Sequence, residues 1–260
     1  MYKRQTYNIC PKNIREIITD DTQAILATHV FGNPVNIEAL DEISKTTNVK
    51  IIYDAAHCFG VSYKGKSVLE YGDISTLSTH ATKIFHTVEG GFLHASSKSV
   101  EHKIALMKNF GHDGPDKFSS IGINAKNSEF HAAMGLANLD FMDIILERRK
   151  AQYLLYLAHL SVYSGLQFQT IRQDTDYNYS YFPVIFPTEA AVEQVQKRLQ
   201  ENDIIPRRYF YPSLNNLSYV DYMPAPNAER IAKQILCLPL YHELEDSSIL
   251  HICDLIKSAI

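Results

Sequence analysis

Hydrophobic positions in the first hundred residues alternate between strand-like runs and helical spacing. Segments 23–28 and 49–53 are short apolar runs, the second rich in isoleucine, and such runs are typical of buried strands. Between them, segment 36–46 carries apolar residues at helical spacing, and Asn36 can cap this helix. A further short helix is expected at 11–18. The strand–helix–strand order predicts a mostly parallel sheet covered by helices.

The middle of the chain predicts shorter elements and then a long helix. Strands are expected at 61–63, 74–77 and 91–95, a helix at 98–109, and a loop at 110–123, which is rich in Gly, Ser and Asp. Segment 128–160 contains no proline and a single glycine, Gly135. It therefore predicts one continuous helix, and helices of this length often connect two domains.

The last hundred residues predict a smaller α/β unit. We expect a strand at 181–186, helices at 189–201 and 245–259, an extended segment at 204–209 and a loop at 213–226. The chain is accordingly expected to divide into a large domain, residues 1–145, and a smaller C-terminal domain, residues 146–260.

Composition narrows the class of protein. The 260 residues are 45% hydrophobic and 21% charged, with a net charge of −4, as in an ordinary globular protein. No cluster of Lys and Arg suggests nucleic-acid binding. The four cysteines are widely spaced, which favours reduced thiols in a cytoplasmic protein. No leader-like or membrane-spanning apolar segment is expected, because no apolar run approaches about 20 residues.

Two polar residues lie where α/β proteins place chemistry. Asp54 ends the predicted strand 49–53, and the carboxyl end of a parallel strand is a frequent ligand position. Its carboxylate could cap the following turn or hold a cationic nitrogen. Lys83 lies between two predicted strands, where it could be a solvated surface residue or a catalytic amine. Ser78 precedes Lys83 and a Gly90-Gly91 turn follows it.

Together these residues match the needs of pyridoxal phosphate. This cofactor requires a lysine for its aldehyde carbon and an acid that keeps its ring nitrogen protonated. It also requires hydroxyl or backbone N–H groups for its phosphate. Asp54, Ser78, Lys83 and the two glycines supply much of that set.

Ordered motifs make a resemblance specific. The stretch 21–96 resembles the DegT/DnrJ/EryC1/StrS family of sugar aminotransferases, and the similarity runs over essentially the whole chain. Thr79 stands where the family's lysine motif usually has Phe. The matching motifs are His29-Val30-Phe31-Gly32, Asp54-Ala55-Ala56-His57, Gly65-Lys66, Gly72-Asp73, Ser78-Thr79-His80-Ala81-Thr82-Lys83, Glu89-Gly90-Gly91, Gly122-Ile123-Asn124 and Ala132-Ala133.

The resemblance implies a fold and a set of roles. The fold would be that of the type I, aspartate-aminotransferase-like pyridoxal phosphate enzymes. Lys83 would bond the cofactor, Asp54 would pair with its ring nitrogen, His57 would lie beside the ring and Ser78 would bind the phosphate. Asn124 would reach the phosphate of a neighbouring subunit, which implies a homodimer with shared sites. His57 as a packed core residue and Asn124 as a turn residue remain alternatives.

The same resemblance implies a substrate class. The family transfers an amino group from glutamate to nucleotide-linked keto sugars, as in O-antigen and other polysaccharide biosynthesis. The resemblance is nearest to members that form dTDP-4-amino-4,6-dideoxyglucose from a 4-keto-6-deoxy sugar. A lysine at position 83, rather than histidine, favours transamination over dehydration. The segment Arg207-Arg208-Tyr209-Phe210-Tyr211 resembles one near the sugar site, although a solvated basic pair is the alternative for the arginines.

The chain also departs from the family. Members usually begin about 90 residues earlier, with a loop and a helix N-terminus that help bind the cofactor phosphate. We therefore expect an incomplete large-domain sheet, and an inactive fragment that acts as a dimerisation module is the alternative function. A metal protein built on the histidines is a third hypothesis. Their spacing fits no compact ligand pattern, so no metal is expected. The histidines concerned are His29, His57, His80, His86 and His112.

Overall fold

The computed structural model describes residues 6–260, which form two compact units by their contacts. We call residues 8–142 with 171–178 the N-terminal unit. Residues 143–170 and 179–260, with residues 6 and 7, form the C-terminal unit. The predicted domains 1–145 and 146–260 stay a prediction, because a cluster of contacts does not establish an independently folding domain.

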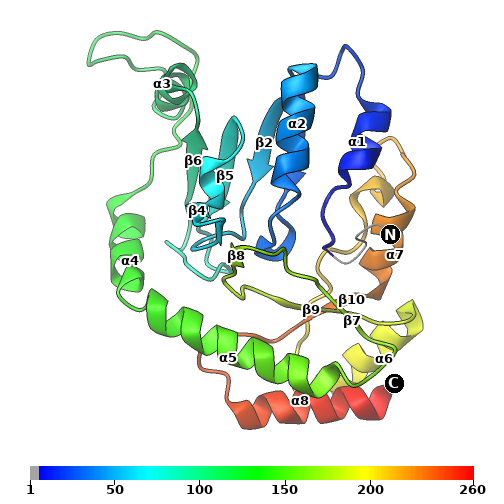
Figure 1. The fold of residues 1–260 in the computed structure, drawn as a ribbon. Helices are drawn as coiled ribbons and strands as arrows, with labels where there is room; N and C mark the ends of the chain where they lie inside the picture. Colours follow the sequence, from blue (N-terminus) through cyan, green and yellow to red (C-terminus); the bar gives the residue numbers. More distant parts are fainter. Residues whose placement is uncertain (1–5) are drawn as a thin grey trace. The chain divides into compact units, whose positions relative to one another are not determined.

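A four-stranded mixed sheet forms the centre of the N-terminal unit, in the order β1–β2–β5–β6 (Figure 1). Strands β1 (Ala24–Thr28), β2 (Lys50–Asp54) and β5 (Ile74–Ser78) are parallel, and β6 (Gly91–Ala95) runs antiparallel to β5. The pairing confirms the expected mostly parallel sheet. Since parallel strands share a direction, the carboxyl ends of β1, β2 and β5 meet at one edge.

Helices α1 (Pro11–Ile17) and α2 (Ile37–Thr47) supply the apolar side chains that pack against this sheet. The cap prediction is confirmed, because the Asn36 side chain accepts a hydrogen bond from the Ala39 backbone N–H at 3.4 Å. Alternate positions of the strands face the helices, as the twofold side-chain period requires. The core residues from these four elements are Ile14, Ile25, Ala27, Ile37, Leu40, Ile43, Ile51 and Tyr53.

A small second sheet ties a late segment to the N-terminal unit. Its order is β4 (Lys66–Ser67), β3 (Ser62–Tyr63) and β8 (Thr175–Asp176). Beside it, the Glu38 carboxylate accepts hydrogen bonds from Tyr63, Lys64 and Arg172, each at 2.6 Å. Short 3-10 helices η1 (Val30–Gly32) and η2 (Val68–Glu70) complete this part, and α3 (Lys98–Met107) follows β6.

The predicted single helix over 128–160 is wrong. The structure has α4 (Glu129–Leu139) and α5 (Met142–Leu160), with a turn at Asp140–Phe141. A tertiary contact accompanies the break: the Asn138 carboxamide donates to the His86 carbonyl at 2.8 Å. No proline or glycine lies at the break, so the local sequence does not predict it.

The C-terminal unit has an antiparallel sheet in the order β10–β9–β7. Its strands are β7 (Gln167–Phe168), β9 (Phe182–Ile185) and β10 (Ile235–Leu238), and helices α5, α6 (Glu189–Gln200) and α8 (Asp246–Ala259) supply its apolar core. Thus the predicted strand 181–186 and the helices 189–201 and 245–259 are confirmed within a residue or so at each end.

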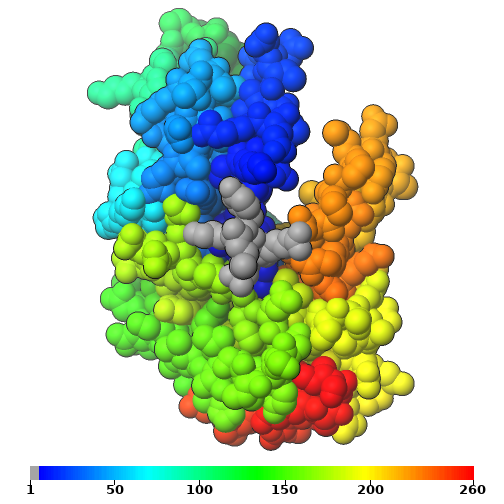
Figure 2. All heavy atoms as spheres, turned by 45° about the vertical axis from the view of Figure 1, so that its right-hand side comes forward, coloured from blue at the N-terminus to red at the C-terminus, as the bar shows by residue number. Residues whose placement is uncertain are grey.

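Two segments of this unit have little regular structure, as expected. The extended segment 204–209 forms an isolated bridge, Arg207 with Cys237. The loop 213–226 contains the 3-10 helix η3 (Leu214–Asn216), and helix α7 (Pro226–Gln234) and strand β10 directly follow it. The loop 213–226 and helix α7 are drawn in orange shades in Figure 2. Among residues 6–260, no helix combines the length and apolarity that crossing a membrane requires.

Candidate active site

Asp54 lies at the carboxyl edge of the sheet. Its Cα pairs in register with those of Thr28 on β1 and Thr76 on β5. One carboxylate oxygen accepts the Ala56 backbone N–H at 3.0 Å, and the other accepts the Thr28 hydroxyl at 3.4 Å. Asp54 therefore does cap a turn. A carboxylate has about four lone-pair sites, so the two hydrogen bonds leave capacity for a cationic ligand.

Ser78 ends β5 at the same edge, opposite Gly91 of β6. Its hydroxyl accepts the His80 backbone N–H at 3.3 Å, which starts a turn away from the sheet. The structure therefore brings Asp54 and Ser78 to one edge, on neighbouring strands. A carboxylate and a hydroxyl so placed can hold the basic and the anionic parts of one ligand.

Lys83 lies in the loop 79–90, which leaves this edge at the end of β5 and returns at the start of β6. Its backbone N–H donates to the His80 carbonyl at 2.9 Å. Farther along, Ala81 N–H donates to the Val88 carbonyl at 2.7 Å, and Thr79 N–H to the Gly90 carbonyl at 3.0 Å. These bonds fold the loop back on itself, so the lysine is held in an ordered turn.

His80 and Glu89 form a polar pair on this loop. His80 Nδ1 accepts the Thr82 backbone N–H at 3.2 Å, so the ring proton of neutral His80 is on Nε2. That nitrogen lies 3.5 Å from the Glu89 carboxylate. The pair is partly exposed, so it orients the loop surface and adds little stability.

His57 is buried, and its ring stacks on Phe31 with centroids 6.2 Å apart. Its backbone carbonyl accepts the Asn178 side-chain amide at 2.9 Å. The predicted place of His57 beside a ring ligand stays a prediction. Its burial and its contact with Phe31 also fit the alternative role of a packed core residue. His29 is a core residue: burial lowers its pKa to about 3, and Nδ1 accepts the Val35 N–H at 3.0 Å.

Asn124 lies in the exposed segment between α3 and α4. Its side-chain oxygen accepts a hydrogen bond from Lys126 at 2.6 Å, and its backbone bridges to Asn109. Within the single chain, these contacts give Asn124 a turn-forming role. Its predicted contact with a second subunit is a separate expectation.

The predicted substrate segment belongs to the C-terminal unit. Arg207 lies over the Tyr209 ring at 4.1 Å, and Arg208 over the Tyr211 ring at 3.6 Å. Arg208 also pairs with Glu189 at 2.9 Å and lowers the pKa of that carboxyl group. With its side chain only 17% exposed, Arg208 is not a solvated cation. Arg207 is the more exposed of the two.

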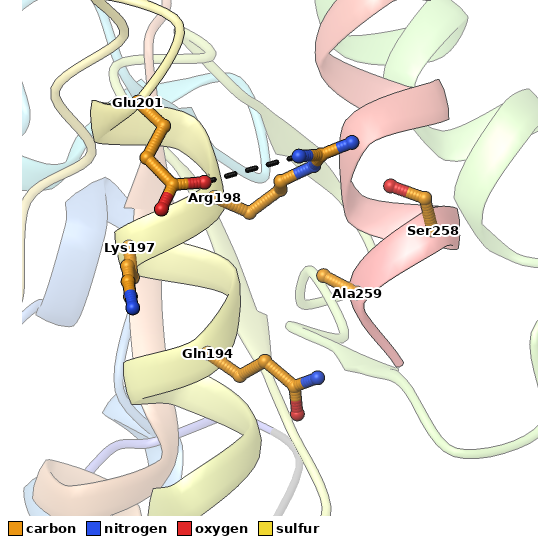
Figure 3. A pocket seen from close by; sticks show the side chains of 6 residues that line it. All are labelled: Gln194, Lys197, Arg198, Glu201, Ser258 and Ala259. Carbon is orange, nitrogen blue, oxygen red and sulfur yellow. Dashed lines mark ion pairs between the residues drawn. The ribbon is translucent and has the colours of Figure 1, made fainter.

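A shallow hollow between α6 and α8 is lined by other residues of the C-terminal unit (Figure 3). Gln194, Lys197, Arg198 and Glu201 come from α6 or its end, and Ser258 and Ala259 from α8. Arg198 and Glu201 pair across 3.8 Å. None of the predicted site residues lines this hollow. Within the described part of the chain, no three His, Cys, Asp or Glu side chains gather as metal ligands.

Sequence reasoning missed three residues that shape the site edge. Thr28 contacts the Asp54 carboxylate, and Thr79 and Thr87 join their hydroxyls at 2.7 Å beneath the Lys83 loop. The position of Thr28 at the end of the strand before Asp54 was an available signal. The pairing of Thr79 with Thr87 had none, because it depends on how the loop closes.

Comparison with known proteins gives the relationship directly. The model of the DegT/DnrJ/EryC1/StrS aminotransferase family matches residues 2–257. A dTDP-4-amino-4,6-dideoxy-D-glucose transaminase from Shigella dysenteriae is 38% identical over 252 residues, which cover 95% of this chain and 69% of the relative. The Escherichia coli protein of the same name is 33% identical over 261 residues, covering 96% and 70%.

A solved structure confirms the expected fold class. The crystal structure of DesI, determined in the presence of its TDP-sugar product, superposes with a TM-score of 0.89 at 27% identity. The alignment covers 99% of this chain and 67% of DesI. Family model, sequence relatives and fold agree, and the chain belongs to the DegT/DnrJ/EryC1/StrS aminotransferase family.

Proposed function

We propose that this chain binds pyridoxal phosphate and transfers the amino group of glutamate to a nucleotide-linked keto-deoxy sugar. The sugar would resemble dTDP-4-keto-6-deoxyglucose, and the product would serve O-antigen or other polysaccharide biosynthesis. One observation carries the proposal. Asp54, Ser78 and the Lys83 loop gather at one sheet edge, in a chain 38% identical to a transaminase named for dTDP-4-amino-4,6-dideoxy-D-glucose.

The side chains at this edge fit pyridoxal phosphate. When bound, that cofactor supplies an aldehyde carbon that carries the amino group and a ring that withdraws electrons. Lys83 Nζ would hold the aldehyde carbon and, once released, would take and return a proton. The Asp54 carboxylate would hold the ring nitrogen protonated, since a carboxylate beside a fixed cation stays ionised. The Ser78 hydroxyl would donate to the phosphate, and His57 would lie beside the ring.

The homodimer belongs to the same proposal. Helix α4 exposes several apolar side chains in the single chain, including Phe130 at 89% exposure, with Leu136 and Leu139. Contiguous exposed apolar side chains are typical of interaction surfaces. A second copy packed on α4 would bury them and would bring the nearby Asn124 segment toward the partner's cofactor phosphate.

For the substrate, the aromatic and basic segment of the C-terminal unit supplies suitable groups. Arg207 would contact a phosphate or the glutamate carboxylate, since its guanidinium is the more exposed. Arg208 would act mainly by fixing Tyr211, because Glu189 and the Lys233 carbonyl already hold its guanidinium. Tyr209 and Tyr211 would present ring faces and hydroxyls to the sugar.

The compartment proposed is the cytoplasm. All four cysteines are free thiols, and Cys58, Cys237 and Cys253 are buried. Burial raises the pKa of each of these three thiols, so they are protonated and unreactive near neutral pH. Unpaired cysteines are the usual state in reducing compartments.

Two measurements test the function. Purified chain with added pyridoxal phosphate should develop the absorbance of lysine-bound cofactor, and borohydride should fix the cofactor on Lys83. Glutamate and a dTDP-linked 4-keto-6-deoxyhexose should then yield 2-oxoglutarate and an amino sugar. Lys83→Arg should abolish both results, whereas Lys103→Arg, an exposed lysine on α3, should change neither. Absence of any Lys83 adduct in the wild-type chain would favour an inactive dimerisation module.

A further inference from the structure

The loop that carries Lys83 is closed at its base by two buried hydroxyl groups. Thr79 and Thr87 are 1% and 5% exposed, and their Oγ1 atoms lie 2.7 Å apart. Thr87 Oγ1 also lies 2.7 Å from the Glu89 carbonyl, to which it donates. Because a hydroxyl has one proton, Thr79 must be the donor between the two threonines. The hydrogen bonds therefore run from Thr79 to Thr87 to the backbone of Glu89.

The surrounding residues fit this pair closely. Gly90 has a φ of +146°, and a Cβ there would lie 2.5 Å from Thr87 Oγ1 and 2.8 Å from Thr79 Oγ1. A side chain at position 90 would therefore displace the hydroxyl pair. On the other side, a Cβ at Gly135 of α4 would lie 2.8 Å from Thr87 Cγ2. Both glycines permit backbone to approach the threonines.

The rest of the loop is held by contacts that do not involve Lys83. Phe85 stacks on Phe59 with ring centroids 4.1 Å apart. The Asn138 carboxamide of α4 donates to the His86 carbonyl at 2.8 Å. Residues 84–87 are therefore anchored on the side after the lysine. Backbone bonds such as Thr87 N–H to the Thr79 carbonyl at 2.9 Å join the two sides of the loop, and the Thr79–Thr87 hydroxyl pair adds a buried side-chain link between them.

We propose that the Thr79–Thr87 hydroxyl pair is a positioning device that sets the orientation of Lys83 toward the sheet edge. The inference rests on the proposed function, because it assigns a task to the loop only if Lys83 is the reactive amine. Thr79 stands where the family's motif usually has Phe, and the space around it is filled by Thr87 and Gly90. In this chain, directional hydrogen bonds hold the base of the loop.

Matched variants separate the hydroxyl from the rest of the side chain. Thr79→Val keeps the shape but removes the donor, so Thr87 Oγ1 loses a buried hydrogen bond. Thr79→Ser keeps the donor. Thr175→Val is the control, because the Thr175 hydroxyl is buried in the same unit and has no hydrogen-bond partner among the described residues.

Each variant is compared with the wild type by two measurements. Amide hydrogen exchange of the cofactor-free chain reports loop opening, and Thr79→Val should speed exchange in segment 80–89 about tenfold without changing β1 and β2. Borohydride trapping with pyridoxal phosphate across a pH series reports the reactivity of Lys83. Thr79→Val should lower the preference for Lys83 over other lysines about tenfold and shift its pH profile, because a disordered amine samples more solvent. Thr79→Ser and Thr175→Val should match the wild type.

The outcomes distinguish this inference from the proposed function. If wild-type Lys83 is not labelled in preference to other lysines, the proposed function fails and this inference fails with it. If wild-type Lys83 is labelled and Thr79→Val keeps the same preference and pH profile, only the positioning role is overturned. An equal loss of the preference for Lys83 in Thr79→Ser would also overturn the positioning role, because the hydroxyl would then have no specific task. Faster amide exchange throughout β1 and β2 in Thr79→Val would do the same, because the change would not be confined to the loop.

Discussion

At the scale of single residues, the Asp54 carboxylate combines a local and a chemical role. It accepts the Ala56 N–H and contacts the Thr28 hydroxyl, so its orientation is fixed before any ligand binds. An asparagine oxygen could still accept the Ala56 N–H. The negative charge, and not the turn, is therefore what the residue contributes to a cationic ring.

We expect Asp54→Asn to lower turnover on the order of 100-fold or more, because it removes a preorganised charge. Cofactor binding should fall far less, since the turn and the other contacts remain. Steady-state amino transfer and a spectroscopic titration with pyridoxal phosphate measure the two effects. Asp41→Asn, on the exposed side of α2, is the control. Near-normal turnover in Asp54→Asn would contradict the assignment.

Glu38 makes stability dependent on pH. Burial alone would raise the pKa of its carboxyl group, but hydrogen bonds from Lys64 and Tyr63 outweigh that and lower it from 4.5 to about 2. The folded state therefore gains stability above pH 4.5, and the gain disappears as the pH falls toward 2.

We expect Glu38→Gln to be less stable than the wild type at pH 7, with a difference that narrows as the pH falls below 4.5. Urea unfolding at several pH values measures it. Glu42→Gln on the same helix removes only an exposed ion pair with Arg15, so its difference should stay small throughout. A Glu38→Gln difference that is constant with pH would exclude this carboxylate as the cause.

At the scale of elements, α4 illustrates how packing overrides helix propensity. Gly135 lies in the middle of α4, where alanine would favour the helix by about 1 kcal/mol. An alanine Cβ would however collide with Thr87 Cγ2. The glycine thus weakens the helix and lets α4 contact the Lys83 loop.

We expect Gly135→Ala to destabilise the protein by about 1 kcal/mol, since overpacking outweighs the gain in propensity. In a Thr87→Ser background, which keeps the hydroxyl but lacks Cγ2, the same change should be neutral or stabilising. Denaturant unfolding of the four proteins gives the coupling energy. If Gly135→Ala stabilises the wild-type background, the close approach of α4 to the loop is wrong.

Most elements could be predicted because their hydrophobic period is unambiguous. Strands β1, β2 and β5 and the helices α2, α6 and α8 each bury one regular face or stripe, which the sequence displays directly. Helix α7 and strand β10 were missed because nine helical residues pass into four buried ones without a turn signal. The division between α4 and α5 was missed for a different reason, the Asn138 contact, which lies 52 residues from its partner in sequence.

At the scale of the whole molecule, the proposed homodimer makes a prediction that no single-chain variant can test. If Lys83 and Asn124 of one site come from different subunits, each heterodimer of two inactive variants has one site with both defects and one intact site. A mixture of Lys83→Ala and Asn124→Ala chains should then recover roughly a quarter of wild-type activity after random exchange of subunits.

The control is a mixture of Lys83→Ala chains with Asp54→Asn chains, because one subunit is predicted to supply both residues to the same site. No recovery is expected there if both residues serve the same site from one subunit, because the heterodimer then contains no intact site. Recovery in the control, or none in the Lys83 and Asn124 mixture, would exclude a site shared in the proposed way.

By itself, the sequence determined the family, the mostly parallel sheet and the residues proposed for the site, because ordered motifs and hydrophobic periods are local in the chain. Tertiary structure alone decided that Asp54 and Ser78 end neighbouring strands, and that Thr79 meets Thr87 beneath Lys83. It also decided that Arg208 is held by Glu189 while Arg207 is more exposed. Such contacts depend on strand order and loop closure, which bring together residues whose spacing in the chain carries no signal.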